Sequence, residues 1–311
     1  EQLNARLDAV ESLNAHIDVQ NDVINQLKML PDLERLITRV HAGSIQLKPF
    51  LQVLEALEMI SQLKVSIDQD GQALFTHSTL LKRLMIDKFP DLEELLGLVR
   101  SVNIDASRES GKLVIVEGAD AEFDQANAQV QQTKDMFTQH LATLREKMQA
   151  PKMRFRDIGK DKYLIEVPLN SLKSSLVPTD FREVRRLKTV VRYRDKETMR
   201  FLPILDRAID RLALISSSLL CTFIQRLDSK FFELIKTLIV HVAELDVLIS
   251  LAQTSSSLPA GASCRPHFPT ATNCDRQTEK IYDEQHSLID LEECRHPLLR
   301  LPAGKDVIPN T

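Results

Sequence analysis

Apolar residues recur every three to four positions through most of the chain, which predicts a mainly α-helical protein. In residues 1–100 this pattern is broken into short amphipathic runs. One run covers residues 3–13, a second follows Asp32, which can cap a helix, and a third opens at Pro49. Each short helix has to bury its apolar face against another element, so we expect a helical core.

Two longer runs without proline come next. The first covers residues 123–148 and the second runs from Ile204 to Leu258. At 1.5 Å per residue, a first helix of about 28 residues would be about 42 Å long, and the apolar positions of the second run, Leu205 to Ile249, correspond to up to about 70 Å. The apolar stripe of the first run is narrow and consists of Phe123, Ala126, Val130, Phe137, Leu141, Leu144 and Met148.

Between the long runs the pattern changes to that of short strands. We interpret residues 154–158 and 163–167 as two strands joined by a tight turn over Gly159 to Lys162, followed by a loop through Pro178. A further strand or buried extended segment is expected at residues 113–116. This order, a long helix followed by a small sheet and then a second long helix that returns, predicts a long antiparallel helical arm with a β-containing tip. The alternative is a compact helical bundle with a solvated charged loop.

Composition narrows the class of protein. The 311 residues are 27% charged and 43% apolar but only 5% aromatic, with 8 Gly and 4 Cys. These values exclude a collagen-like, disulfide-stapled or wholly disordered chain, and they disfavour a glycine-rich nucleotide-binding fold. The uncharged, largely apolar stretch Leu212 to Gln225 is too short to cross a membrane. No cationic, apolar signal segment opens the sequence, so we expect a reducing compartment and no membrane partner.

The net charge of −4 hides an uneven distribution. Residues 151–200 hold 6 Lys and 8 Arg against 4 Asp and 3 Glu, a net charge of +7, which leaves −11 for the rest of the chain. The basic charge therefore gathers at the expected tip. Residues 181–194 mix Arg and Lys with one Thr and one Tyr, a set that suits phosphate oxygens more than base edges. The other interpretation of such a run is a solvated face.

Other site chemistry finds little support. Six Cys and His residues crowd the last fifty positions, but they include no Cys-x-x-Cys pair and match no common zinc ligand spacing. They are Cys264, His267, Cys274, His286, Cys294 and His296. We therefore expect no metal site. The sequence also lacks a Gly-x-Ser-x-Gly elbow and a phosphate-binding loop, so we expect no catalytic residues.

Several segments, in order and spacing, resemble the MutS family of DNA mismatch repair proteins. They are Arg6-Leu7-Asp8-Ala9-Val10-Glu11, Leu30-Pro31-Asp32-Leu33-Glu34-Arg35-Leu36, Val242-Ala243-Glu244-Leu245-Asp246-Val247-Leu248, Arg295-His296-Pro297 and Ile308-Pro309-Asn310. Within the family, Ile115-Val116-Glu117-Gly118 and Tyr163-Leu164-Ile165-Glu166-Val167-Pro168 most resemble the mismatch-reading subunit of the eukaryotic heterodimer.

The resemblance implies an internal piece of such a protein. Residues 1–120 and 226–260 would form the helical core or lever domain, 121–225 the clamp domain with its arm and its basic tip at 151–200, and 261–311 a linker with the truncated start of the ATPase domain. It implies a nuclear protein that binds the backbone of double-stranded DNA beside a second MutS subunit of the homologue-two type. ATP and magnesium would belong to the parent protein, and Ile308 and Asn310 would border its nucleotide pocket.

The family's clamp positions map onto seven residues of this chain. They are Lys160, Lys162, Arg185, Arg186, Lys188, Thr189 and Arg192. The resemblance implies that the parent is a DNA-dependent ATPase, whereas this chain, which lacks the phosphate-binding loop, is expected to be inactive alone. The competing hypothesis is a helical scaffold whose long arm binds partner proteins and whose basic tip meets acidic surfaces.

Overall fold

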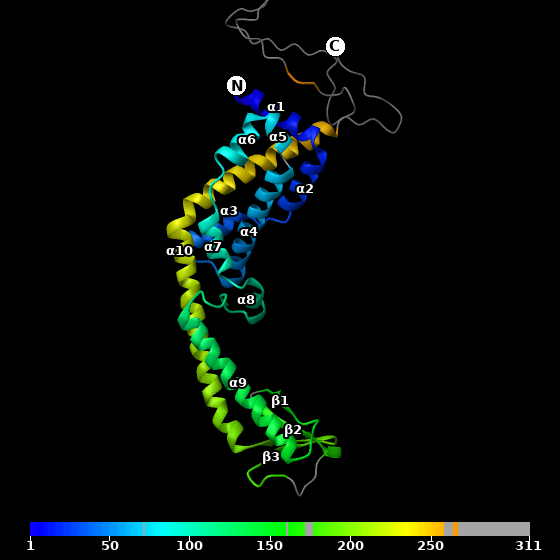
Figure 1. Ribbon diagram of the computed structural model, residues 1–311, viewed down its shortest axis with the longest axis vertical. Helices are drawn as coiled ribbons and strands as arrows, with labels where there is room; N and C mark the ends of the chain where they lie inside the picture. The colour runs from blue at the N-terminus through cyan, green and yellow to red at the C-terminus, as the bar shows by residue number, and fades with distance from the viewer. Residues whose placement is uncertain (71, 160, 172–176, 258–263, 267–311) are drawn as a thin grey trace, which may run out of the picture. The chain divides into compact units, whose positions relative to one another are not determined.

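A computed structural model of the chain describes residues 1–70, 72–159, 161–171, 177–257 and 264–266 (Figure 1). The protein is mainly α-helical, with one small antiparallel sheet and one helix of 61 residues, which confirms the predicted fold class. The helices of the described residues are α1 (Gln2–Ala15), α2 (Ile17–Leu27), α3 (Leu33–His41), α4 (Leu47–Asp70), α5 (Gln72–His77), α6 (Thr79–Lys82), α7 (Glu93–Arg100), α8 (Ile104–Ser110), α9 (Ala121–Lys147) and α10 (Lys196–Ser256). The strands are β1 (Arg154–Ile158), β2 (Asp161–Pro168), β3 (Arg182–Arg186) and β4 (Val190–Arg194). A π-helical turn, η1 (Arg83–Asp87), and a 3₁₀ turn, η2 (Leu169–Ser171), complete the set.

The chain divides into two compact units. Unit 1 comprises residues 1–30 and 59–90 and the described residues from 236 onward. Unit 2 comprises residues 31–58 and 91–235. Helices α4 and α10 contribute residues to both units.

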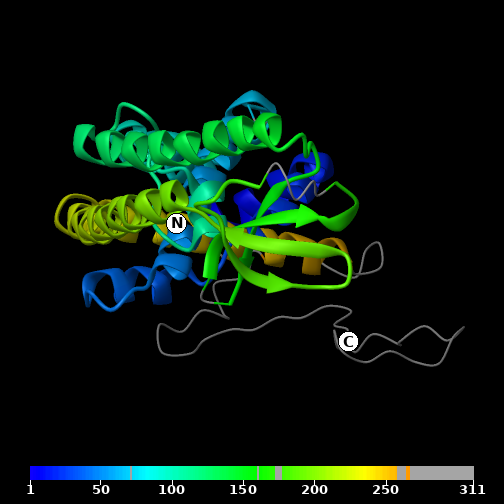
Figure 2. The same cartoon turned by 90° about the horizontal axis from the view of Figure 1, so that it is seen from below.

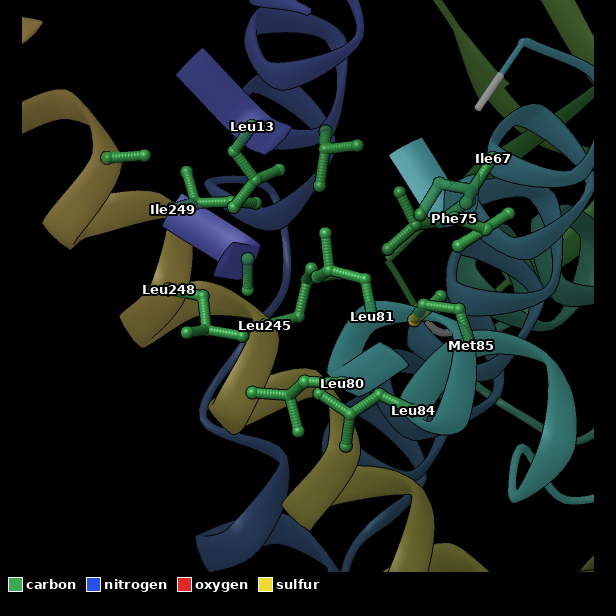
Figure 3. Packing of buried hydrophobic residues seen from close by; sticks show 14 of the residues in the cluster. Leu13, Ile67, Phe75, Leu80, Leu81, Leu84, Met85, Leu245, Leu248 and Ile249 are labelled. Carbon is green, nitrogen blue, oxygen red and sulfur yellow. The ribbon is translucent and has the colours of Figure 1, made fainter. Parts of the chain in front are cut away.

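Unit 1 is built around one apolar cluster (Figure 3). Leu13 of α1 and Leu81 of α6 lie in it together with Leu248 of α10, and each of these side chains is at most 2% exposed. The predicted helix at residues 3–13 is confirmed as α1. Leu3 is nevertheless 50% exposed, because the buried face of α1 runs through Ala9 and Leu13 instead.

The first helices of unit 2 follow the sequence signals closely. The Asp32 carboxylate accepts a hydrogen bond from the backbone N–H of Arg35 at 3.0 Å, which is the predicted cap of α3. Helix α4 begins at Leu47, so Pro49 lies in its first turn, where a missing N–H costs nothing. The strand expected at residues 113–116 is reduced to a single bridge between Ile115 and Val102.

The arm of unit 2 consists of α9 and the first part of α10, which run side by side to the sheet (Figure 1). Asp120 caps α9 by accepting from the backbone N–H of Phe123 at 2.8 Å. Phe137 is 1% exposed and packs with Leu205 of α10. Its ring also stacks on Tyr163 of β2 with centroids 4.1 Å apart, so one aromatic side chain joins both helices to the sheet.

The return helix begins earlier than the sequence indicates. We expected a start at Ile204, but α10 begins at Lys196 and contains Pro203. Asp195 explains the earlier start, because its carboxylate accepts from the backbone N–H of Thr198 at 3.2 Å and caps the helix. Pro203 then costs one backbone hydrogen bond within an otherwise regular helix.

The sheet has four antiparallel strands in the order β1-β2-β4-β3, and it faces the viewer in Figure 2. The predicted hairpin over Gly159 is confirmed as β1 and β2, and Gly159 adopts a left-handed φ of 58° in the turn. Strands β3 and β4 were not predicted. They form a second hairpin, in which β4 pairs with β2 and β3 lies at the edge.

Candidate nucleic-acid interface

One face of the sheet is fixed by its packing against the end of α9. Ile165 and Val167 of β2 and Val191 and Tyr193 of β4 are each at most 5% exposed and share a cluster with apolar side chains of α9. Those side chains are Leu141 and Leu144, and Met148, the residue that follows α9, joins them. Because successive side chains of a strand point to opposite faces, the residues between these positions project from the other face of the sheet.

That other face carries arginines from three of the four strands. One row of paired positions crosses the sheet as Arg154, Glu166, Arg192 and Arg185. The next positions along the strands add Arg156 on β1 and the directly paired Arg182 and Arg194. Directly paired residues of antiparallel strands project from the same face. We call this surface the arginine face; its guanidinium groups belong to Arg154, Arg156, Arg182, Arg185, Arg192 and Arg194.

Glu166 is the buried carboxylate of the arginine face. Its side chain is 5% exposed, and both of its oxygens accept hydrogen bonds from arginines. Oε1 accepts from Nε of Arg154 at 3.0 Å and from Nη2 of Arg154 at 2.8 Å. Oε2 accepts from Nε of Arg192 at 3.0 Å. Arg192, 13% exposed, is thus held inside the surface, whereas Arg154 is 61% exposed.

The ionisation of Glu166 follows from this setting. Burial by itself raises the pKa of the Glu166 carboxyl group, since a charged group loses solvation. The hydrogen bonds and the positive charges of Arg154 and Arg192 act in the opposite direction and prevail, so the pKa lies below its ordinary value. Glu166 is therefore a carboxylate at neutral pH, and the three groups together carry a net charge of about +1.

The loop of the second hairpin presents free cationic side chains. Arg185 of β3 and the loop residues Lys188 and Thr189 are all exposed. The backbone N–H of Leu187 donates to the carbonyl of Val190 at 2.9 Å, which closes a loop of two residues. Within the part of the chain that the structure describes, neither Arg185 nor Lys188 forms an ion pair.

Two other expected binding residues already have acidic partners. Arg186 lies opposite Val191, on the face that packs against α9, and its guanidinium donates to both oxygens of Glu183 at 3.0 and 2.7 Å. Lys162 donates to Asp206 of α10 at 3.0 Å, and this hydrogen bond raises the pKa of Lys162. The structure therefore brings Arg185, Lys188, Thr189 and Arg192 together on one hairpin and directs Arg186 and Lys162 elsewhere. Lys160, Ile308 and Asn310 lie outside the described residues.

The sequence pattern missed Arg154, Arg156, Arg182, Arg194 and Glu166. A signal for most of them was present, because Arg154-x-Arg156 and Arg192-x-Arg194 place arginines on one face of an extended segment. Finding the face required two strands that the sequence did not reveal.

The described residues include neither a cluster of metal ligands nor a membrane-spanning helix. No three of their His, Cys, Asp and Glu side chains are grouped as a metal ion would require. Cys264 is exposed, and the other five Cys and His residues of the C-terminal group lie outside the described residues. None of the described helices combines the length and the apolar character needed to cross a membrane.

Comparison with known proteins gives one consistent result. The family model of MutS domain III matches residues 1–252. The DNA mismatch repair protein MSH6 of Saccharomyces cerevisiae is 27% identical over 317 residues, which cover 99% of this chain and 24% of that protein. Msh6 of Homo sapiens is 24% identical over 340 residues, covering 99% of this chain and 24% of that protein. MSH3 of Mycosarcoma maydis is 25% identical over 323 residues, covering 100% of this chain and 26% of that protein. The chain spans about a quarter of the length of these curated relatives.

Proposed function

Because the chain belongs to the MutS domain III family, we propose that it is the DNA-engaging part of a mismatch repair protein and binds the phosphate backbone of double-stranded DNA. The observation that carries this proposal is the arginine face, where arginines of three strands share one surface and two of them, Arg154 and Arg192, bond a buried carboxylate. Charge concentrated in this way attracts a polyanion.

The chemistry of the face favours phosphates over base edges. Arginine presents a planar fork of donors that fits the oxygens of a phosphate, and contacts of this kind position a protein on DNA without reading its sequence. The exposed cations of this surface, which include Arg154, Arg182, Arg185 and Lys188, are available to such oxygens, and Thr189 adds a hydroxyl group. Arg186 and Lys162 contribute less, since a carboxylate of the chain already neutralises each of them.

We extend the same proposal to the other parts of the chain. Residues 121–225 act as a clamp that touches DNA, residues 1–120 and 226–260 act as a lever, and residues 261–311 lead into an ATPase domain. Relatives named MSH6 and MSH3 support a second MutS-family subunit as partner and a nuclear location. ATP and magnesium would be bound by the whole protein, with Ile308 and Asn310 beside the nucleotide.

Fluorescence anisotropy with a labelled duplex of random sequence tests DNA binding directly. If about four phosphates are neutralised, log K should fall with log salt with a slope of about −3.6. The double variant Arg185→Glu/Lys188→Glu should bind more weakly, and its slope should be shallower by about 1.8, because two of those contacts are lost.

The matched control makes the same change in net charge at positions away from the sheet. Lys82 and Lys112 are exposed and lie outside the sheet, so Lys82→Glu/Lys112→Glu should leave the affinity within about twofold of the unmodified chain. Equal losses in both double variants would indicate only non-specific attraction to a charged molecule. Unchanged affinity in the Arg185 and Lys188 variant would favour the alternative, a helical scaffold that binds partner proteins.

A further inference from the structure

A carboxylate in the middle of the arginine face opposes DNA binding if charge alone matters. Glu166 lies between Arg154 and Arg192 in the row that crosses the sheet. Removing its negative charge would make the surface more positive, and each cation that neutralises a phosphate adds to the affinity for DNA. A side chain that only reduced the surface charge would therefore weaken the proposed function.

The geometry gives Glu166 a different role. Two donors from the planar fork of Arg154, Nε and Nη2, meet the same carboxylate oxygen at 3.0 and 2.8 Å, and this double contact restricts rotation of the guanidinium. The second oxygen holds Arg192 through its Nε at 3.0 Å. With 5% of its side chain exposed, Glu166 has little freedom to move, so both arginines are tied to a rigid point of the sheet.

The hydrogen bonds to Glu166 leave part of each guanidinium available. Among the described residues, Nη1 of Arg154 and both terminal nitrogens of Arg192 make no hydrogen bond. An arginine that is free in solution loses its rotamer freedom when DNA binds it. An arginine already held by a buried carboxylate has lost that freedom on folding, so its remaining donors meet the phosphate in a prepared orientation.

We propose that Glu166 is a positioning residue for DNA binding. It holds Arg154 and Arg192 in one row with Arg185, so that the remaining donors of both arginines are already ordered when they meet the phosphates of a duplex. This inference rests on the proposed function of the arginine face. It reverses the sign that simple charge predicts, since loss of the carboxylate should weaken DNA binding.

The main test compares two substitutions that remove one negative charge from the same sheet. Glu166→Gln removes the buried carboxylate, whereas Glu183→Gln removes one that is 40% exposed and pairs with Arg186 of its own strand. In the full chain, Glu166→Gln should bind duplex DNA about three- to tenfold more weakly, with a salt slope shallower by about 0.9 per lost contact. Glu183→Gln should bind equally well or more tightly. Equal or tighter binding by Glu166→Gln would overturn the proposal.

A second variant covers the case in which Glu166→Gln fails to fold, which its melting curve would reveal. Arg154 lies on the edge strand β1 and is 61% exposed, so Arg154→Lys should fold while keeping the charge and losing the fork. We expect this variant to bind DNA about two- to fivefold more weakly; equal affinity would contradict the positioning role. Where both single variants fold, the double variant Glu166→Gln/Arg154→Lys should bind DNA only slightly more weakly than Glu166→Gln, because each substitution alone already breaks the contact between Arg154 and Glu166.

The outcomes separate this inference from the function on which it rests. If Arg185→Glu/Lys188→Glu loses affinity while Glu166→Gln behaves like Glu183→Gln, the arginine face binds DNA and only the positioning role is wrong. If none of these variants changes the affinity, the proposed DNA-binding surface itself is wrong.

Discussion

Arg185 and Arg186 are adjacent in the sequence but belong to opposite faces of the sheet. Arg185 lies opposite Arg192 on the arginine face and has no ion pair among the described residues. Arg186 lies opposite Val191 and donates to both oxygens of Glu183. Two residues that look equivalent in a basic run therefore differ in charge environment and direction.

This difference predicts unequal effects of the same substitution. Arg185→Gln should weaken binding to duplex DNA about fivefold, the equivalent of about 1 kcal/mol for one contact with a charged group. Arg186→Gln should change the affinity less than about twofold, because its guanidinium is already neutralised. Anisotropy titrations of both variants at one salt concentration measure the difference. The reverse order of effects would mean that DNA meets the other face of the sheet.

Glu166 should make stability depend on pH in the acid range. Its pKa is lower in the folded state than in the unfolded state, because its hydrogen bonds and ion pairs with Arg154 and Arg192 outweigh the effect of burial. Its contribution to stability is then complete above the unfolded pKa of about 4.3 and is lost as the pH falls through the lower folded value. Thermal melting at pH 7 and in steps below pH 5 should show a smaller acid loss for Glu166→Gln than for the unmodified chain. Identical losses would contradict the lowered pKa.

Asp195 should be important for the arm, because it serves two partners at the start of α10. It is 2% exposed, caps the helix through Thr198 and is hydrogen-bonded to the ring of His140 of α9. Asp195→Ala removes both hydrogen bonds and should lower the free energy of unfolding by on the order of 3 kcal/mol. Asp195→Asn can still accept from Thr198 and should cost less. Urea unfolding followed by circular dichroism compares them, and equal losses would show that the cap contributes nothing.

His241 provides a separate pH response in unit 1. Burial is the main cause that lowers the pKa of its imidazole, and the positive charges of Lys88 and Arg83 add to it, against an opposing effect of Glu244. The imidazole of His241 therefore binds a proton more readily in the unfolded chain than in the folded one. The stability that neutral His241 contributes is present above the unfolded pKa of about 6.5 and is lost as the pH falls through the lower folded pKa. The change in melting temperature between pH 7.5 and 5.5 should be smaller for His241→Gln than for the unmodified chain. A larger change in the variant would contradict the direction of the shift.

The parts of the fold that the sequence predicted are those with a strong local signal. Asp32 indicates the start of α3, because its carboxylate can cap a helix, and the residues of α9 carry an uninterrupted apolar stripe. Strand β3 has neither kind of signal, because all five of its residues are exposed and four are charged. In β4 two buried residues, Val191 and Tyr193, alternate with arginines, which is a weak pattern over five positions.

The candidate site was only partly predictable for a related reason. The charge of residues 151–200 identified the region, but the pairing of β3 with β4 decides which cations share a face. That pairing includes a register shift between Glu183 and Arg185, and a shift of one position moves a side chain to the opposite side. The partnership of Glu166 with Arg192 depends on the same tertiary pairing, which no local pattern encodes.

The position of β3 has a consequence for how the molecule behaves in a crowded solution. An outermost strand leaves backbone donors and acceptors open to any extended peptide, which is a common route to aggregation. Here that rim carries Arg182, Arg185 and Arg186, and a second copy approaching side by side would bring like charges together. The cations proposed to hold a duplex would thus also keep this protein from polymerising through its own sheet.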